Sequence, residues 1–217
     1  MKGLLKNNYY ATIANAKLIF VVTVLLCALS IVMKSQMLLV TFILLCMIGF
    51  SIISIVGLRK EIASKWNKYK ITTPLKRVDI IKGYFLSHLL WLIVGMLIAG
   101  AGVALSIILS GLLFDKNIDI FNFYVLGIGI SLFTGAFFFP TVLFLERRRT
   151  KRGFLAISLL CGIGIIAGLA TLMNAVFPTP MSNAQIIIVG TIIITIAVFA
   201  FAISCFLTIS IYRKRDY

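Results

Sequence analysis

Residues 153–212 read GFLAISLLCGIGIIAGLATLMNAVFPTPMSNAQIIIVGTIIITIAVFAFAISCFLTISIY and contain no Asp, Glu, Lys or Arg. A helix rises about 1.5 Å per residue and the hydrocarbon core of a bilayer is about 30 Å thick, so one crossing needs roughly 20 apolar residues. Within this run, residues 178–183 read PTPMSN, and prolines with small polar residues do not continue a helix that faces lipid. The run therefore predicts two membrane crossings joined by a short turn.

Four other runs also lack charged side chains, at residues 18–33, 35–58, 83–114 and 120–145. The five runs together hold 158 of the 217 residues. The chain is 61% hydrophobic and 12% charged, whereas an ordinary soluble domain is about 45 to 50% apolar and about 25% charged. These values exclude a water-soluble globular protein. We expect one all-α, polytopic membrane domain over residues 1–217, with six transmembrane helices near residues 15–34, 36–58, 84–113, 120–145, 153–177 and 184–212.

The first charge-free run is short, because residues 18–33 would span only about 24 Å as a helix. Lys17 and Lys34 can lengthen it if their stems run along the helix and their ammonium groups reach the headgroups. A cleaved signal peptide is the alternative. No small-x-small cleavage motif lies near residues 30–36 and a second span follows at once, so we expect a retained helix.

The basic residues indicate the orientation of the spans. Of the 21 basic residues, 19 fall in the N-terminal segment, in loops 59–83 and 146–152, and at the C-terminus, while the alternate loops carry only Lys34 and Lys116. Basic residues concentrate on the cytoplasmic side, so both termini are predicted to be cytoplasmic. The net charge of +15 is then a topology signal, because anionic lipid favours each basic residue by about 1 kcal/mol. No nucleic-acid partner is expected.

Several kinds of chemistry lack the residues that they need. The chain has no Gly-x-x-x-x-Gly-Lys-Ser/Thr phosphate loop and a single histidine, His88, which we interpret as a hydrogen-bonded structural residue near the membrane interface. No carboxylate lies within a predicted span, which disfavours ion-coupled transport. We expect no catalytic site, disulfide, metal or cofactor in this chain. The four cysteines are interpreted as packing residues: Cys27, Cys46, Cys161 and Cys205.

The loop 59–83 shows the clearest pattern among the polar segments. Ile62, Trp66 and Tyr69 fall at i, i+4 and i+7, which predicts a short amphipathic helix with one apolar stripe. Thr73 can cap the next helix, with Pro74 at its first position. The residues alone leave open whether this short helix docks on a protein partner or lies on lipid.

The same loop resembles a known family. The string EIASKWNKY at residues 61–69, followed by TPLKRVDII at residues 73–81, resembles the segment between the second and third spans of small ABC-2 type permeases. The opening MKGLLKN at residues 1–7 also looks like the start of these proteins. Lys76 stands where the family usually has serine, and Tyr84 where a basic residue is common. Within the family, the chain looks most like the permease subunits of staphylococcal phenol-soluble modulin exporters.

The resemblance implies a division of labour with a separate cytoplasmic ATPase, which binds ATP and magnesium. A coupling helix, here residues 61–73, would sit in a groove of that ATPase. Trp66 and Tyr69 would be its aromatic anchors, and Glu61 and Lys65 its rim charges. The implied ATPase-coupling residues are Glu61, Lys65, Trp66, Tyr69, Pro74, Arg77 and Asp79. The second basic loop would be either an auxiliary contact or a lipid clamp, through Arg147, Arg148 and Arg149.

Small residues recur at four-residue spacing within the spans, which lets helices approach closely in lipid. They are Gly95 and Ala99; Gly127, Ser131 and Gly135; and Gly164 and Gly168. Most are expected to pack helices within one chain. Some are expected at an interface with a second permease, identical or a close paralogue, because six spans are half of the twelve usual in the family. Pro140 predicts a kink near the cytoplasmic end of the fourth span, either a hinge or a static bend.

The polar groups of the spans are few and scattered: Thr23, Ser30, Thr134, Asn174 and Thr195. The resemblance implies the transmembrane subunit of an ATP-driven exporter in a bacterial cell membrane. The scarcity of polar groups leads us to expect hydrophobic substrates or amphipathic peptides, cytolytic peptides among them. The alternative is a non-transporting membrane protein, such as an immunity or sensor-associated factor, that binds a peptide or a partner. A membrane-embedded enzyme ranks third.

Overall fold

The computed structural model describes residues 2–63, 77–111, 114, 117–144, 154–176 and 182–213. Within these residues every regular element is a helix. The helices are α1 (Lys2–Val32), α2 (Gln36–Leu44), the π-helical turn η1 (Leu45–Gly49), α3 (Phe50–Ala63), α5 (Arg77–Ser110), α6 (Asn117–Phe144), α7 (Phe154–Val176) and α8 (Asn183–Arg213). The all-α prediction is confirmed.

Five helical stretches are long and apolar enough to cross a membrane. They are Gln36–Glu61, Val78–Ser110, Ile118–Val142, Leu155–Met173 and Asn183–Ile211. A shorter apolar stretch, Ala16–Val32, forms the second half of α1 and corresponds to the predicted short first span. The described part of α5 starts at Arg77, within the predicted loop 59–83 and before the predicted third span at residue 84. The predicted first helical position, Pro74, lies outside the described residues. Asp79 in the first turn of α5 interacts favourably with the positive end of the helix dipole, which supports a helix start in this region.

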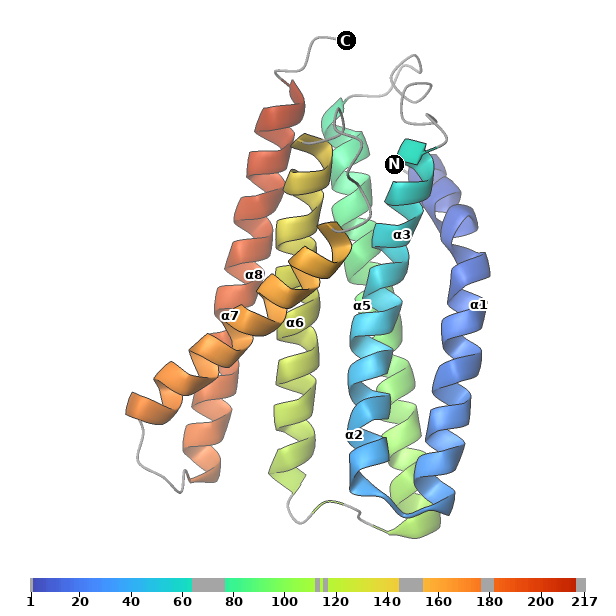
Figure 1. Cartoon of the computed structure of the whole chain (residues 1–217), viewed down its shortest axis with the longest axis vertical. Helices are drawn as coiled ribbons and strands as arrows, with labels where there is room; N and C mark the ends of the chain where they lie inside the picture. The colour runs from blue at the N-terminus through green and yellow to red at the C-terminus, as the bar shows by residue number, and fades with distance from the viewer. Residues whose placement is uncertain are drawn as a thin grey trace.

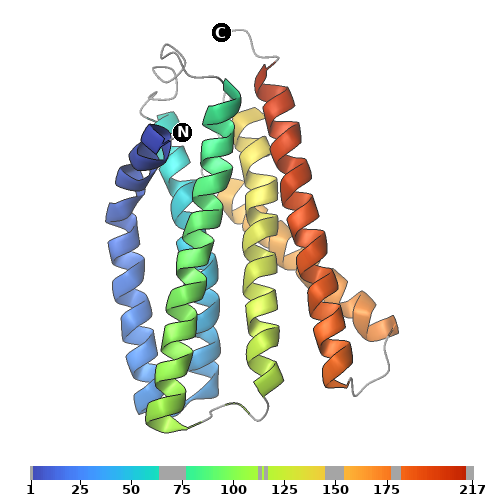
Figure 2. The same cartoon turned by 180° about the vertical axis from the view of Figure 1, so that it is seen from behind.

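The helices form one bundle in which the start of α1 and the end of α8 lie at the same end (Figure 1). The column α2–η1–α3 packs against α1 and α5, and α6 packs against α8 (Figures 1 and 2). The helix α7 crosses the face of α6 and α8 obliquely. Apolar side chains cover the outside of the bundle, as lipid contact requires, among them Ile108 and Phe206 at 78% and 74% exposure.

Two helices approach the π-helical turn η1 closely at glycine residues. A Cβ atom on Gly95 of α5 would overlap the carbonyl oxygen of Cys46 in η1, so only glycine permits this contact. Gly127 of α6 lies similarly against the side chain of Met47. The predicted small residues Ala99 and Ser131 are fully buried, at 0% exposure.

The remaining small residues differ in their surroundings. A Cβ on Gly135 would meet His88 and Phe201, so Gly135 also lies in a helix contact within the chain. Gly164 and Gly168 of α7 have no neighbouring atoms within 4 Å of an added Cβ. These two glycines therefore face outward from the described part of the bundle.

Pro140 lies inside α6, four residues from its end. Proline has no backbone N–H, so the carbonyl oxygen of Ala136 loses its helical partner. The Ser204 hydroxyl of α8 donates a hydrogen bond to this oxygen at 2.5 Å. The proline therefore frees a backbone acceptor that ties α6 to α8.

The Ser204 contact gives a matched stability test. Ser204→Ala should lower the free energy of unfolding in detergent by about 1 to 3 kcal/mol, because the carbonyl of Ala136 would be buried without a partner. Ser106→Ala is the control. The Ser106 hydroxyl is buried without a hydrogen-bond partner among the described residues, so its removal should be neutral or stabilising. Equal destabilisation by both substitutions would contradict the assignment.

Candidate functional site

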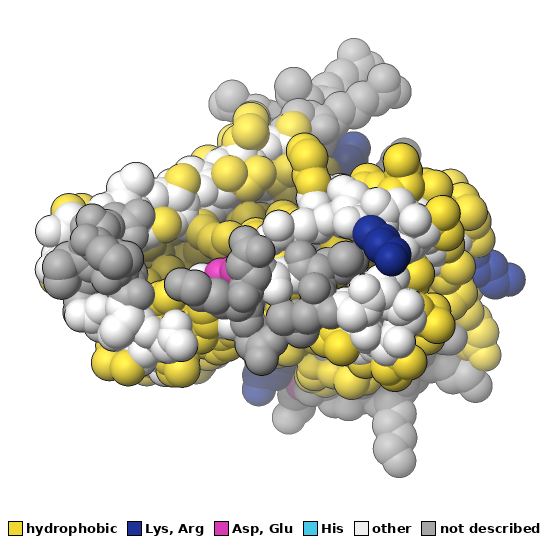
Figure 3. Space-filling model, turned by 90° about the horizontal axis from the view of Figure 1, so that it is seen from below, with side chains coloured by type: hydrophobic (Ala, Val, Ile, Leu, Met, Phe, Trp, Pro, Cys, Tyr) yellow, Lys and Arg dark blue, Asp and Glu magenta, His cyan; other side chains and the backbone are white. Residues whose placement is uncertain are grey.

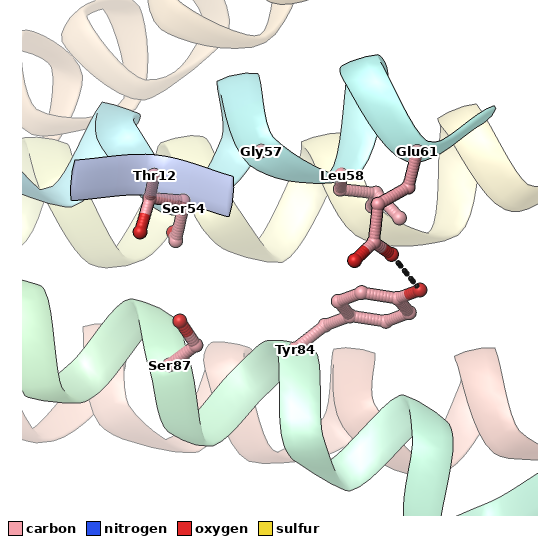
Figure 4. Close-up of a pocket in the computed structure, with 7 residues that line it drawn as sticks. All are labelled: Thr12, Ser54, Gly57, Leu58, Glu61, Tyr84 and Ser87. Carbon is pink, nitrogen blue, oxygen red and sulfur yellow. Dashed lines mark hydrogen bonds between the residues drawn. The ribbon is translucent and has the colours of Figure 1, made fainter. Parts of the chain in front are cut away.

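A buried polar cluster lies where α1, α3 and α5 meet, near the end of the bundle that holds the start of α1. Glu61 is in the last turn of α3, and its side chain is only 5% exposed. The Tyr84 hydroxyl of α5 donates a hydrogen bond to Glu61 Oε2 at 2.6 Å (Figure 4). Tyr84 is also buried, at 5% exposure. Because burial strengthens a charge-assisted hydrogen bond, this contact joins the end of α3 firmly to α5.

A small cavity lies beside the bond between Glu61 and Tyr84. Its free volume is about 10 Å³, which is the space of about one water molecule. Figure 4 shows its lining, in which the Tyr84 hydroxyl lies beside the Glu61 carboxylate and the hydroxyl groups of Thr12, Ser54 and Ser87 lie farther along the cavity. The lining residues are Thr12, Ser54, Gly57, Leu58, Glu61, Tyr84 and Ser87.

Gly57 brings α1 into the cluster. A Cβ on Gly57 would overlap the Thr12 methyl group, so a larger residue there would push α1 away from α3. Thr12 itself is only 1% exposed. The cluster therefore depends on three helices, and α1 is part of it through one glycine.

His88 continues the polar cluster toward the centre of the bundle. Its Nε2 donates to the carbonyl oxygen of Ser131 at 3.2 Å, and its Nδ1 lies 3.1 Å from the Ser54 hydroxyl. The ring stacks on Phe201 and meets Phe139 edge-on, with centroid distances of 5.5 and 5.6 Å. His88 is thus hydrogen-bonded, as predicted. It is fully buried and joins α3, α5, α6 and α8.

Only some of the predicted coupling residues are among the residues that the structure describes. Lys65, Trp66, Tyr69 and Pro74 lie outside the described residues, as do all three predicted arginines at 147–149. Arg77 and Asp79 both belong to the first turn of α5, where Asp79 is half-buried.

Glu61 differs from the rim charge that the resemblance implied. In the structure its carboxylate points inward to Tyr84, although it does lie next to the predicted coupling segment. The sequence analysis noted Tyr84 only as a departure from the family pattern. In the structure its hydroxyl donates a hydrogen bond to Glu61. Thr12, Ser54 and Ser87 were not predicted. The sequence does contain a pattern that indicates this cluster: Tyr84, Ser87 and His88 fall at i, i+3 and i+4 and so share one face of an apolar helix.

The described residues contain no group of three or more His, Cys, Asp or Glu side chains that could hold a metal ion. Together with the apolar helices, the bundle defines the class of the protein as a multi-pass helical membrane protein. Residues 3–213 match the family described as ABC-2 family transporter protein, so the chain belongs to that family. No curated protein sequence and no solved structure matches the chain.

Family membership has direct consequences for the chain's role. ABC-2 permeases are generally the non-catalytic transmembrane subunits of their transporters. They work with an ABC-type ATPase and often with a second permease. The closer resemblance to phenol-soluble modulin exporters has no relative to support it.

The bond between Glu61 and Tyr84 can be measured with a double-mutant cycle. Tyr84→Phe keeps the ring and removes the donor, so it should lower the free energy of unfolding by about 1.5 to 3 kcal/mol. Glu61→Gln keeps an acceptor oxygen for the tyrosine and should cost less. The double variant Glu61→Gln/Tyr84→Phe should be less destabilised than the sum of its single variants. Strict additivity would show that the two side chains do not interact.

Proposed function

We propose that this chain is the transmembrane subunit of an ABC exporter in a bacterial cell membrane, with both termini cytoplasmic. The family match over residues 3–213 carries the proposal, supported by helices that are apolar and long enough to cross the membrane. The driving force comes from ATP hydrolysis in a separate ATPase. The permease supplies the path for a hydrophobic or amphipathic substrate.

The buried cluster supports an ATPase contact at the segment that joins α3 to α5. Glu61 lies three residues before this segment, which covers residues 64–76, and α5 begins immediately after it. The hydrogen bond from Tyr84 to Glu61 and the packing of α3 on α5 join the two helices at this end. A displacement of the segment would therefore move α3 and α5 together. In this proposal Trp66 and Tyr69 anchor the segment to the ATPase, with Lys65, Pro74, Arg77 and Asp79 around them.

The described polar side chains of the spans favour an apolar substrate. The hydroxyl groups of Thr23, Ser30 and Thr195 donate to carbonyl oxygens of their own helices, at 2.8 Å in each case. Thr134 does the same toward Ile130, at 2.7 Å. These hydroxyls are already bonded, so they offer little to a sugar or a hydrated ion. Amphipathic peptides, cytolytic ones included, fit such a path better.

A second permease copy completes the proposed transporter. Gly164 and Gly168 present an outward face of α7 on which another helix could approach closely. Two permeases would also match the two-fold symmetry of an ATPase dimer. Arg147, Arg148 and Arg149 would contact either the ATPase or anionic lipid headgroups at the cytoplasmic surface.

Co-purification tests the coupling assignment. Tagged chain should recover an ABC-type ATPase, and the mass of the complex should correspond to two permeases. Trp66→Ala or Tyr69→Ala should weaken ATPase binding about thirtyfold, because truncating an aromatic anchor costs about 2 kcal/mol or more. The control is Phe206→Ala, which removes an aromatic ring that is 74% exposed on α8. Recovery without an ATPase would refute the permease role, and full recovery by both loop variants would refute the coupling segment.

Transport by reconstituted vesicles tests the substrate class. Vesicles that hold the permease and its ATPase should move a hydrophobic amphipathic peptide when ATP is supplied, because the described spans offer an apolar path. Vesicles without ATP give the background. A small hydrophilic solute should stay at that background, and ATP-dependent movement of the solute alone would contradict the proposal.

A further inference from the structure

A second hollow lies at the opposite end of the bundle from the polar cluster, between α6, α7 and α8. Its volume is about 320 Å³, which is within the range of small-molecule sites. Figure 3 views the molecule from this end and shows an acidic side chain beside a hollow with hydrophobic walls. We call this hollow the α6–α8 groove; its lining includes Asp119, Asn122, Phe123, Leu126, Ala170 and Val189.

The path of α7 explains why the groove exists. In the first half of α7, Gly162 lies so close to α6 that an added Cβ would meet Thr134 and the carbonyl oxygen of Ile130. Toward its other end, α7 runs obliquely away from α6 and α8 (Figure 1). The helices α6 and α8 stay together there, because Gly190 lets α8 lie against Phe121 and Val125. These two helices form the floor of the groove, and Ala170 of α7 lies in its wall.

The groove combines two kinds of surface. Most of its described lining is aliphatic or aromatic, while Asp119 in the first turn of α6 and Asn122 one turn later supply polar groups. The described lining contains no lysine or arginine. A carboxylate beside an apolar trough favours a cation with a hydrocarbon portion, because the two parts of such a molecule match the two parts of the surface.

We propose that the α6–α8 groove binds a cationic amphiphile, with its ammonium group at Asp119 and Asn122 and its hydrocarbon portion along Phe123, Leu126 and Val189. This inference rests on the proposed exporter function and names the chemical class of its substrate as amine-bearing amphiphiles. An anionic amphiphile would place its head against the Asp119 carboxylate, which costs free energy. A hydrophilic solute would leave the apolar walls without a partner.

Photo-crosslinking of the purified full chain in dodecyl maltoside micelles tests the site directly. The probes are dodecylamine and dodecyl sulfate, each with a diazirine at the end of the chain and each used at trace concentration. Dodecylamine should label α6, α7 and α8 about tenfold more than dodecyl sulfate, since a hydrogen bond between charged groups contributes at least that factor. Asp119→Asn should bring the ratio close to one. Asp216→Asn removes a carboxylate three residues beyond the end of α8 and should leave the ratio unchanged.

A second pair of variants tests the apolar wall without altering charge. Ala170→Phe should fill the groove and reduce labelling by both probes. Its control is Thr171→Phe, because Thr171 is exposed on the next position of α7 and donates its hydroxyl to Gly168. Thermal unfolding of each variant identifies any that fails to fold.

Each outcome supports or overturns the proposal. Equal labelling by the two probes, or no effect of Asp119→Asn, would overturn the cation recognition. Labelling that survives Ala170→Phe would overturn the location. Phosphatidylethanolamine that competes as well as unlabelled dodecylamine would make the occupant a membrane lipid and overturn the substrate assignment. The ATPase is absent from this assay, so a failure here leaves the co-purification result intact, and loss of the ATPase contact leaves amphiphile binding intact.

Discussion

The rest of this structure depends on one constraint: backbone N–H and C=O groups inside the bilayer have no water to bond and must form hydrogen bonds within the protein. Every N–H and C=O group inside the hydrocarbon must find a partner within the protein, which leaves continuous helices as the accessible solution. Many hydroxyl groups follow the same constraint, as Thr23 and Ser30 donate to the preceding turns of α1, although Ser106 and Ser131 have no partner among the described residues. Where Pro140 breaks the ladder in α6, Ser204 of α8 supplies the missing donor to Ala136. A local defect in one helix thereby becomes a specific contact with another.

Close helix approach follows from the same environment. Lipid provides little hydrophobic driving force between spans, so tight packing and buried polar contacts hold the bundle together. Gly95 and Gly127 allow α5 and α6 to pack against the π-helical turn η1. His88 then joins four helices through two hydrogen bonds and two ring contacts. The bond between Glu61 and Tyr84 extends this polar core to the end of α3.

The cavity beside Glu61 and the α6–α8 groove differ in size and polarity. The small cavity beside Glu61 has room for about one water molecule and lies near the proposed ATPase-coupling segment. The α6–α8 groove at the other end is about 320 Å³ in volume and largely apolar. Rigid contacts at one end suit the transmission of motion, whereas an open apolar surface at the other end suits a substrate. This separation agrees with the family, whose permeases receive their driving force from another subunit.

Composition and charge patterning alone predicted the all-α membrane class and, from five charge-free runs, the approximate spans, because hydrocarbon excludes charge at every position of a crossing. The family resemblance also came from local sequence, through the residues around Trp66 and Tyr69. Local sequence could not show which polar side chains meet, since Glu61 and Tyr84 are 23 residues apart and lie on different helices. Nor could it tell Gly95 and Gly127, which face neighbouring helices, from Gly164 and Gly168, which face outward. Those distinctions depend on the rotation and tilt of each helix in the bundle. Packing between the helices determines both, and the spacing of small residues is the same in the two cases.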